Sequence, residues 1–554
     1  MATHLRRVST SFIELVPNDS KGSNYLLLCK RSDKVNSFKH HWASISGSIE
    51  RDISIPTTTT NTIINPFSFN LLNTEEHYLE DSFTCAKREI EEETKLSTNQ
   101  SLYFERSGRV QWILNEQKTG GFVVYPFLFR IKLNREDEIK SLEDVKNYLK
   151  HIGFQIDWEH ETFDLFDTEQ FLFESDQSVD VPYPTLRNTV PDLRDTLSRV
   201  YYSRVEKTLE RNVKDCIVDN FTDGAGQITF KAIDVVMRNA LRVYSNLSFE
   251  SIPPYFSLKF SHAQPEVIRA IYFYKKMKDL VWHLDHCRQE MPSIGNFSAY
   301  VFGRILCLKQ SETDIEEDEL RKINELLKTT TLRNWVESIE TRLNHCLDEY
   351  HVRNQLIAKN FLSHITERMS HQKTLSILTH SWSSTVLNCL EALIKHCQNN
   401  EIHLSIFMTE SLPQGEGHKT FKALERYIDE QMIHLHMCND NGVPELLTKQ
   451  RIDAMVVGAD SILPPNCHAN TTIVNKCGTK KLYELSRLHA VPFLVVSDSL
   501  KVMSPLMKEN MIHNIDIFEN VDIDDINIIQ ESQAVNVVES LRYYSQAREK
   551  IYGP

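Results

Sequence analysis

The sequence predicts a multi-domain α/β protein: an α/β/α sandwich, then a helical subdomain, then a doubly wound parallel sheet. Three observations predict this order. Strand-like runs surround one strongly acidic helix in residues 1–185. In residues 195–365 apolar side chains recur at i, i+3 and i+4, the period of amphipathic helices. In residues 366–554 short β-rich runs alternate with helical segments, which is typical of βαβ units.

The bulk composition narrows the class of protein and its partners. A chain of 554 residues corresponds to three or four domains at about 150 residues each. The net charge of −14 argues against nucleic-acid binding, which needs a contiguous basic surface to replace counterions. No run of 18 apolar residues is present, so no membrane span is predicted. The 11 cysteines are scattered without a CxxC pair, which indicates reduced thiols and a cytoplasmic protein.

Two segments mark the organisation of the first part of the chain. The polar stretch at about residues 53–76 interrupts the predicted strands and is interpreted as a surface insertion. The segment at 179–192 (VDVPYPTLRNTVPD) contains three prolines and is the predicted linker to the helical subdomain.

The acidic helix presents three carboxylates on one face. Glu89, Glu92 and Glu93 are spaced i, i+3 and i+4, so their like charges repel one another. A divalent cation would reverse that repulsion, and Mg²⁺ or Mn²⁺ favours carboxylate and phosphate oxygens. The alternative is a solvated acidic face with no ligand. Both interpretations are open from the helix alone.

The surroundings of this helix resemble the signature of the Nudix hydrolases. Residues 88–96 (REIEEETKL) match its second half, and Glu80 stands eight positions before Arg88. Upstream, Gly47 in HHWASISGSIE matches the glycine that opens the signature. The sequence departs from the signature twice: 32 residues separate Gly47 from Glu80 where the family has five, and Lys95 replaces the second glycine.

This resemblance implies a Nudix domain over residues 1–185 that hydrolyses a nucleoside diphosphate derivative. Such hydrolysis uses a metal ion to neutralise developing charge and to activate a water molecule. The implied roles are metal ligation by Glu89, Glu92 and Glu93, catalysis by Glu92 and Glu93, and structural support of the signature by Gly47, Glu80 and Arg88.

The second sequence feature is a predicted anion site in the parallel-sheet domain. Ligands of such Rossmann-like sheets bind at the carboxyl ends of the strands. After the strand IDAMVVGAD, the run NKCGT at 475–479 opens a helix. Its backbone N–H groups and helix dipole suit a phosphate. We therefore expect Asn475, Lys476, Gly478 and Thr479 to bind substrate.

Three stretches, SILTHSWSS, FMTESLPQGEGHK and VVGADSIL, together with NKCGT, carry a second resemblance. They are similar to the family that contains the α, β and δ subunits of translation initiation factor 2B, methylthioribose-1-phosphate isomerase and ribose-1,5-bisphosphate isomerase. The resemblance implies a catalytic Asp460. It places Ser381, an expected substrate contact, where the isomerases have a cysteine, and Leu412 where they have an arginine. Either Glu416 or Gln414 takes the place of their glutamine.

Three functions follow, and the sequence favours the first. It is a metal-dependent Nudix-type hydrolase fused to a domain that binds a sugar phosphate or nucleotide. The second is a ribose-phosphate isomerase acting on ribose 1,5-bisphosphate or methylthioribose 1-phosphate. The third is a non-enzymatic regulatory or assembly protein related to initiation factor 2B. Small phosphorylated molecules are the expected partners, with a homodimer formed through residues 366–554.

Overall fold

The structure is a computed structural model of the chain. It describes residues 4–17, 23–50, 80–97, 102–114, 120–133, 141–173, 188–220, 223–288, 291–306, 315–368, 372–429, 431–463, 471–503, 518–523, 528–531, 544 and 548. The predicted insertion at 53–76 lies outside these residues. Among the described residues, no helix is long and apolar enough to cross a membrane.

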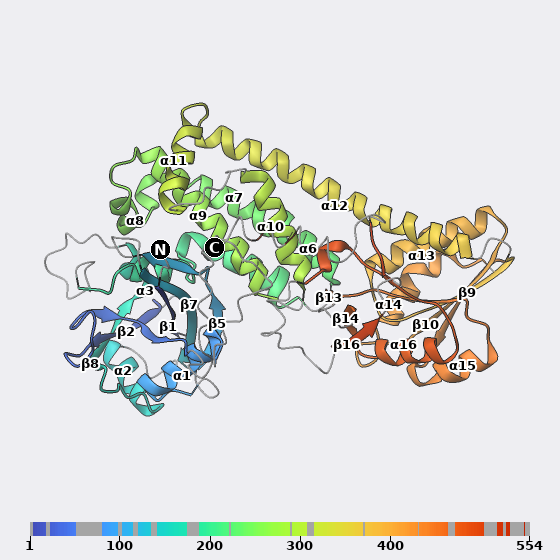
Figure 1. Ribbon diagram of the computed structural model, residues 1–554, viewed down its shortest axis with the longest axis horizontal. Coiled ribbons are helices and arrows are strands. Elements are labelled where there is room, and N and C mark those ends of the chain that lie inside the picture. Colours follow the sequence, from blue (N-terminus) through green and yellow to red (C-terminus); the bar gives the residue numbers. More distant parts are fainter. Residues whose placement is uncertain are drawn as a thin grey trace.

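The N-terminal domain is a mixed eight-stranded sheet with helices packed against it (Figure 1). Its central path runs β3-β2-β1-β7-β5, and β1 pairs in parallel with β7. The strands and helices are β1 (His4–Pro17), β2 (Tyr25–Arg31), β3 (Trp42–Ala43), β4 (Ile45–Ser48), α1 (Ser82–Thr94), β5 (Leu102–Ser107), β6 (Gln111–Leu114), β7 (Gly120–Leu133), α2 (Leu142–His151), β8 (His160–Asp167) and α3 (Thr168–Phe173).

The two faces of this sheet belong to two different cores. Because side chains alternate along a strand, neighbours such as Phe12 and Ile13 point to opposite faces. Ile13 packs in a core with Ala86 and Ile90 of α1. Phe12, in contrast, belongs to one continuous core with the helical subdomain. The second helical layer over the N-terminal sheet is therefore supplied by the helical subdomain.

The described end of the predicted linker is also held by the N-terminal domain. Trp42 donates its backbone N–H to Asn188 O at 2.8 Å, and Val190 donates to Trp42 O at 3.0 Å. Residues 179–187 of the linker lie outside the described residues. What joins the two parts is thus strand-like pairing and a shared core rather than the linker alone.

A cut in the linker is expected to leave the two parts associated. A specific protease site inserted after residue 181 should give fragments of about 180 and 360 residues that co-elute in gel filtration, because the shared apolar core stays buried. The same site placed after Glu50 serves as a cleavage control within one domain. Separate elution of the two fragments without denaturant would contradict the shared core.

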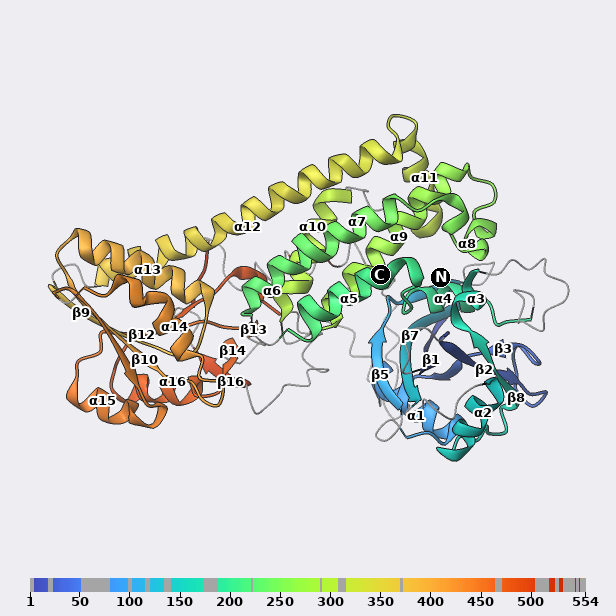
Figure 2. The same cartoon turned by 180° about the vertical axis from the view of Figure 1, so that it is seen from behind.

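The helical subdomain lies between the N-terminal sheet and the last domain (Figures 1 and 2). Its longest helix, α12 (Leu332–Arg368), contributes Trp335 and Leu343 to the helical core but Phe361 and Ile365 to the core of the last domain. The other helices are α4 (Leu193–Ser198), α5 (Lys207–Val213), α6 (Ala225–Lys231), α7 (Arg238–Ser245), α8 (Pro254–Lys259), α9 (Pro265–His286), α10 (Pro292–Leu306) and α11 (Ile315–Leu327), with π-helical turns at Lys214–Val218 and Ala232–Met237.

The last domain is a parallel six-stranded sheet of order β11-β10-β9-β12-β15-β17 with a small antiparallel sheet β13-β14-β16 beside it. The β-rich runs of this region form the parallel strands β9, β10, β11, β12 and β15, so the predicted parallel sheet is confirmed. The elements are β9 (Thr374–Thr379), α13 (Ser384–Asn399), β10 (His403–Thr409), α14 (Gly417–Leu424), β11 (Ile433–Cys438), α15 (Val443–Lys449), β12 (Ala454–Val457), β13 (Ser461–Leu463), β14 (Thr471–Lys476), α16 (Thr479–Leu488), β15 (Phe493–Val496), β16 (Phe518–Ile523) and β17 (Ile528–Ile529).

Candidate functional site

A buried histidine ties together three segments at the carboxyl edge of the parallel sheet. His380 follows β9, and its Nδ1 lies 2.6 Å from Thr409 Oγ1 at the end of β10. Its Nε2 lies 2.9 Å from the Cys477 carbonyl oxygen in the turn before α16. Burial lowers the pKa of His380, so a neutral ring that donates through Nε2 and accepts at Nδ1 satisfies both partners. His380 therefore connects the ends of β9 and β10 to the turn before α16 through hydrogen bonds.

The turn before α16 is shaped by a glycine and two buried polar side chains. Gly478 has φ +104°, and a Cβ there would lie 2.9 Å from His380 Cε1, so a larger residue does not fit. Asn475 Nδ2 donates to Thr479 Oγ1 at 3.1 Å, and Thr479 Oγ1 donates to Lys476 O at 2.7 Å. Asn475 and Thr479, both predicted as substrate contacts, thus hold the turn from beneath.

Ser381 is the most constrained residue of the site. Its backbone φ is +67°, in the left-handed region that serine rarely adopts. Its Oγ donates to Glu416 Oε2 at 2.6 Å, and both residues are buried. Glu416 precedes Gly417, where a Cβ would lie 1.8 Å from Thr409 O. The tight approach at Gly417 turns the chain so that Glu416 faces Ser381.

Two lysines also lie in this region. Lys476 Nζ lies 3.8 Å from Glu416 Oε1 and 3.4 Å from Gln414 Oε1. Buried Lys501 donates to Ala459 O at 2.5 Å, one residue before Asp460. Burial raises the pKa of Asp460, against the opposing effect of Lys501 and Lys476. The edge thus combines a carboxyl with a raised pKa, a carboxylate–hydroxyl pair and two ammonium groups.

Sequence reasoning missed several contributors to this site. Arg288, just after α9, acts electrostatically on Asp460 from the helical subdomain. Asp440 accepts the backbone N–H groups of Ser411 and Leu412 at 2.8 and 2.9 Å, which fixes the loop beside the site. Lys501 lies shortly after β15, and its place after a strand of the parallel sheet was a usable signal. The sequence contains no such signal for Arg288, because a helical pattern does not indicate which domain the end of the helix will contact.

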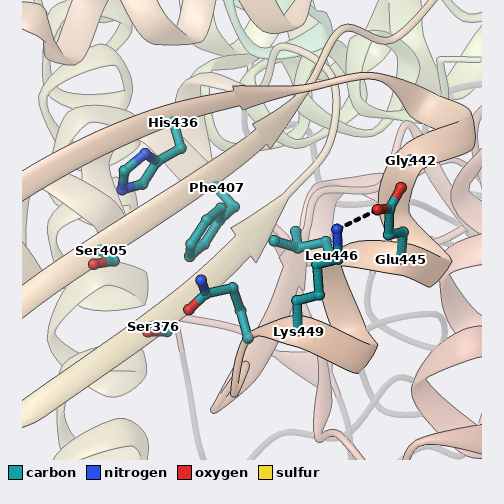
Figure 3. A pocket seen from close by; sticks show the side chains of 9 residues that line it. Ser376, Ser405, Phe407, His436, Gly442, Glu445, Leu446 and Lys449 are labelled. Atoms are coloured by element: carbon teal, nitrogen blue, oxygen red, sulfur yellow. Dashed lines mark hydrogen bonds and ion pairs between the residues drawn. The ribbon is translucent and has the colours of Figure 1, made fainter.

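A separate cavity opens on the same sheet (Figure 3). Its volume is about 370 Å³, and its wall includes Phe407, whose ring stacks on His436 at 4.7 Å. Ser376 and Ser405 line it from near the beginnings of β9 and β10, and α15 closes one side. This cavity is therefore distinct from the site at the carboxyl edge.

In the N-terminal domain, β4 and α1 approach so closely that only glycine fits between them. A Cβ on Gly47 would lie 1.8 Å from the Glu89 carboxyl carbon. Burial raises the pKa of Glu89, and the charges of Glu92 and Glu159 add to that rise. Gly47 and Glu89, which are 42 positions apart in the sequence, therefore meet at one point.

Arg88 joins the carboxylates around α1. It donates to Glu80 through Nε at 3.1 Å and Nη2 at 2.7 Å, and its Nη1 lies 3.0 Å from Glu92 Oε2. Glu92, with 58% of its side chain exposed, faces outward. The helix ends at Lys95, which adopts φ +59° in place of the expected glycine. Arg88 thus pairs the helix with the residue that precedes it, Glu80.

Glu93 lies on the inner side of α1 and is buried. Its Oε2 is 2.6 Å from His160 Nε2, while His160 Nδ1 has no hydrogen-bond partner among the described residues. Burial raises the pKa of Glu93, and the nearby charges of Glu89, Glu159 and Asp157 add to it. Oxygen donors that repel one another suit a divalent cation. In the described part of the chain, however, no three acidic, His or Cys side chains converge tightly enough to form a complete metal site.

The parallel sheet, the glycine turn and the acid–lysine edge define a doubly wound α/β domain preceded by helices. The chain belongs to the initiation factor 2 subunit family, whose model matches residues 267–543. No comparison supports the predicted Nudix domain, which stays a prediction.

The chain is also similar to curated proteins. Ribose 1,5-bisphosphate isomerase of Archaeoglobus fulgidus is 31% identical over 126 residues, 23% of this chain and 36% of that protein. Methylthioribose-1-phosphate isomerase of Rhodopirellula baltica is 26% identical over 246 residues, 40% of this chain and 66% of that protein. Translation initiation factor eIF2B subunit alpha of Dictyostelium discoideum is 31% identical over 127 residues, 23% and 35% respectively. The chain thus spans about a third to two thirds of the length of these relatives.

Solved structures of the family were also found. The chain aligns with eIF2B beta from Chaetomium thermophilum at a TM-score of 0.42 and 12% identity, over 62% of this chain and 93% of that one. It aligns with translation initiation factor eIF-2B from Pyrococcus horikoshii at a TM-score of 0.37 and 17% identity, over 60% and 96%.

Proposed function

We propose that the carboxyl-edge site binds a ribose phosphate and interconverts its aldose and ketose forms. The observation that carries this proposal is Asp460, a carboxyl with a raised pKa set beside Lys476 and Lys501. Aldose–ketose isomerisation needs no external oxidant, because C1 is reduced while C2 is oxidised. It does need protons moved between sugar oxygens, and a carboxyl with a raised pKa is suited to that transfer near neutral pH.

The similarity to two sugar-phosphate isomerases supports the same class of substrate. In this proposal the turn at Gly478 receives the phosphate and Lys476 supplies a charge beside it, while Glu519 already accepts the backbone N–H of Lys480 in the first turn of α16 at 2.7 Å. We therefore prefer an isomerase function to the hydrolase function that the sequence alone favoured. Ribose 1-phosphate incubated with the full-length protein should yield ribulose 1-phosphate.

Lys476→Ala is expected to weaken binding of ribose 1-phosphate by about 1–3 kcal/mol, the range for loss of a charge-assisted hydrogen bond. Titration calorimetry on the full-length protein measures the change. Lys449→Ala is the control, because Lys449 is exposed on α15 and pairs with Glu445. Equal affinities of wild type and Lys476→Ala would remove Lys476 from the site.

Binding of ribose 1-phosphate without turnover would favour the regulatory or assembly function. Self-association through the last domain would then be measured by sedimentation.

A second candidate function is favoured by the approach of Gly47 to Glu89. In this proposal Glu89 and Glu93 would hold Mg²⁺ or Mn²⁺, which would neutralise the phosphate charge during hydrolysis of a nucleoside diphosphate derivative. Arg88 and Glu80 would keep α1 in place beneath it. Residues 1–185 lie entirely outside the region that the family model matches, so this activity would be additional to the first.

Glu93→Gln is expected to lower such hydrolysis on the order of 10²-fold or more, as for loss of a metal ligand. It should also abolish the rise in melting temperature that Mn²⁺ gives the wild type. Glu91→Gln is the matched control, because Glu91 is exposed on the same helix. A wild type that neither cleaves a panel of diphosphates nor responds to Mn²⁺ would contradict this second function.

A further inference from the structure

The hydrogen bond between Ser381 and Glu416 joins a hydroxyl to a carboxylate, which is the arrangement that proton transfer during isomerisation requires. Ser381 Oγ donates to Glu416 Oε2 at 2.6 Å, and neither residue is more than 7% exposed. The other carboxylate oxygen, Oε1, lies 3.8 Å from Lys476 Nζ. A serine hydroxyl alone is a poor acid and base, but a buried carboxylate in direct hydrogen bond can take its proton.

The surrounding backbone holds this pair in one geometry. Ser381 is kept at φ +67°, and its carbonyl oxygen accepts from Thr420 Oγ1 at 2.8 Å. Thr420 lies on α14 one turn after Glu416. This end of α14 therefore contacts both the backbone carbonyl and the hydroxyl of Ser381. Gln414, the other residue considered for this position, contacts Lys476 instead. Glu416 is therefore the residue placed to act on Ser381.

We propose that Glu416, acting through Ser381, accepts the proton released from O2 during isomerisation. This inference rests on the proposed isomerase function. Asp460 protonates the ring oxygen as its bond to C1 breaks. The hydrogen on C2 moves with its electron pair to C1. The O2 proton passes to Ser381 Oγ, whose own proton passes to Glu416 Oε2, and C2 becomes a carbonyl. One proton then returns from Glu416 to Asp460 through water.

The division of labour follows from the two environments. The raised pKa of Asp460 favours its protonated form, which an acid needs. Glu416 accepts a hydrogen bond from a hydroxyl and faces a lysine, the surroundings of a carboxylate that acts as a base. Two carboxyl groups with different surroundings at one edge thus supply the acid and the base.

The experiment measures kcat and KM for ribose 1-phosphate across pH in four full-length variants. Glu416→Gln and Ser381→Ala should each lower kcat on the order of 10²-fold while KM changes little, because both remove the relay and not the phosphate contacts. The double variant should be no worse than either single variant. The dependence of kcat on pH should change in Glu416→Gln, because the pair loses its carboxyl group. Glu410→Gln, which contacts Asn439, is the control.

Ser381→Cys combined with Glu416→Gln provides a rescue arm, since a thiolate replaces the carboxylate as the titratable group of the pair. It should recover at least about ten-fold of the kcat lost in Glu416→Gln, with the pH dependence of a thiol near 8.5. An active wild type whose Glu416→Gln variant keeps its kcat and pH profile would overturn the relay and leave the isomerase standing. A wild type without turnover would overturn both.

Discussion

Asp279→Ala is expected to destabilise the protein by about 3–5 kcal/mol, because it leaves a buried guanidinium without its carboxylate partner. Arg109, next to β6, donates through Nε to Asp279 Oδ1 of α9 at 2.8 Å, and both side chains are about nine-tenths buried. This pair joins the N-terminal domain to the helical subdomain. Urea denaturation followed by fluorescence should show a lower midpoint for the first unfolding transition.

Two further variants separate the pair from its surroundings. Arg109→Leu combined with Asp279→Leu should recover most of the lost stability, since replacing a whole buried pair by apolar residues is often neutral. Glu337→Ala breaks the exposed pair with Arg333 on α12 and should change stability by no more than about 0.5 kcal/mol. If Asp279→Ala unfolds at the same urea concentration as Glu337→Ala, the domains are not joined at this contact.

The contact illustrates why the joining of domains was not predicted from the sequence. Phe12 and Ile13 face different sides of the sheet because side chains alternate along a strand, but a sequence pattern does not show what covers each side. Amphipathic periodicity identifies helices in the same way without naming their partners. α12 shows the same limit, because its apolar stripe is continuous while its two ends pack in different cores.

The carboxyl edge was largely predictable because its residues follow recognisable strands. IDAMVVGAD placed Asp460 at the end of a parallel strand, and NKCGT placed Lys476 before a helix, although Lys476 ends β14 of the small antiparallel sheet rather than a parallel strand. What the sequence left open was which side chain would meet Ser381. Glu416 and Gln414 are two positions apart, and only the close approach of Gly417 to Thr409 decides between them.

The N-terminal site shows the opposite balance. The spacing of Glu89, Glu92 and Glu93 correctly places them on one helix, but a spacing cannot give burial. In the structure Glu93 is enclosed with His160, whereas Glu92 faces solvent. The three carboxylates thus differ in surroundings, and the equal roles that their spacing implied remain a prediction.

Asp460→Asn is expected to lower the kcat of isomerisation on the order of 10²- to 10⁴-fold, the range for loss of a general acid or base. The amide keeps the size of the side chain and its polar contacts but carries no transferable proton. Binding of ribose 1-phosphate should persist, because Lys476 and the turn at Gly478 are unchanged. Full activity in Asp460→Asn would remove this residue from the mechanism.

The same substitution should not lower stability at neutral pH. A carboxyl whose pKa is raised by burial stabilises the fold only while protonated, and that contribution is lost as pH rises through the raised pKa. Asp460→Asn should therefore melt at or above the temperature of the wild type at pH 7. The difference should vanish below a pH of about 4, where aspartate is protonated in both the folded and the unfolded chain. A variant that melts well below the wild type at pH 7 would show that the Asp460 charge holds Lys501 in place, and that Asp460 is a structural ion-pair partner rather than an acid stored for chemistry.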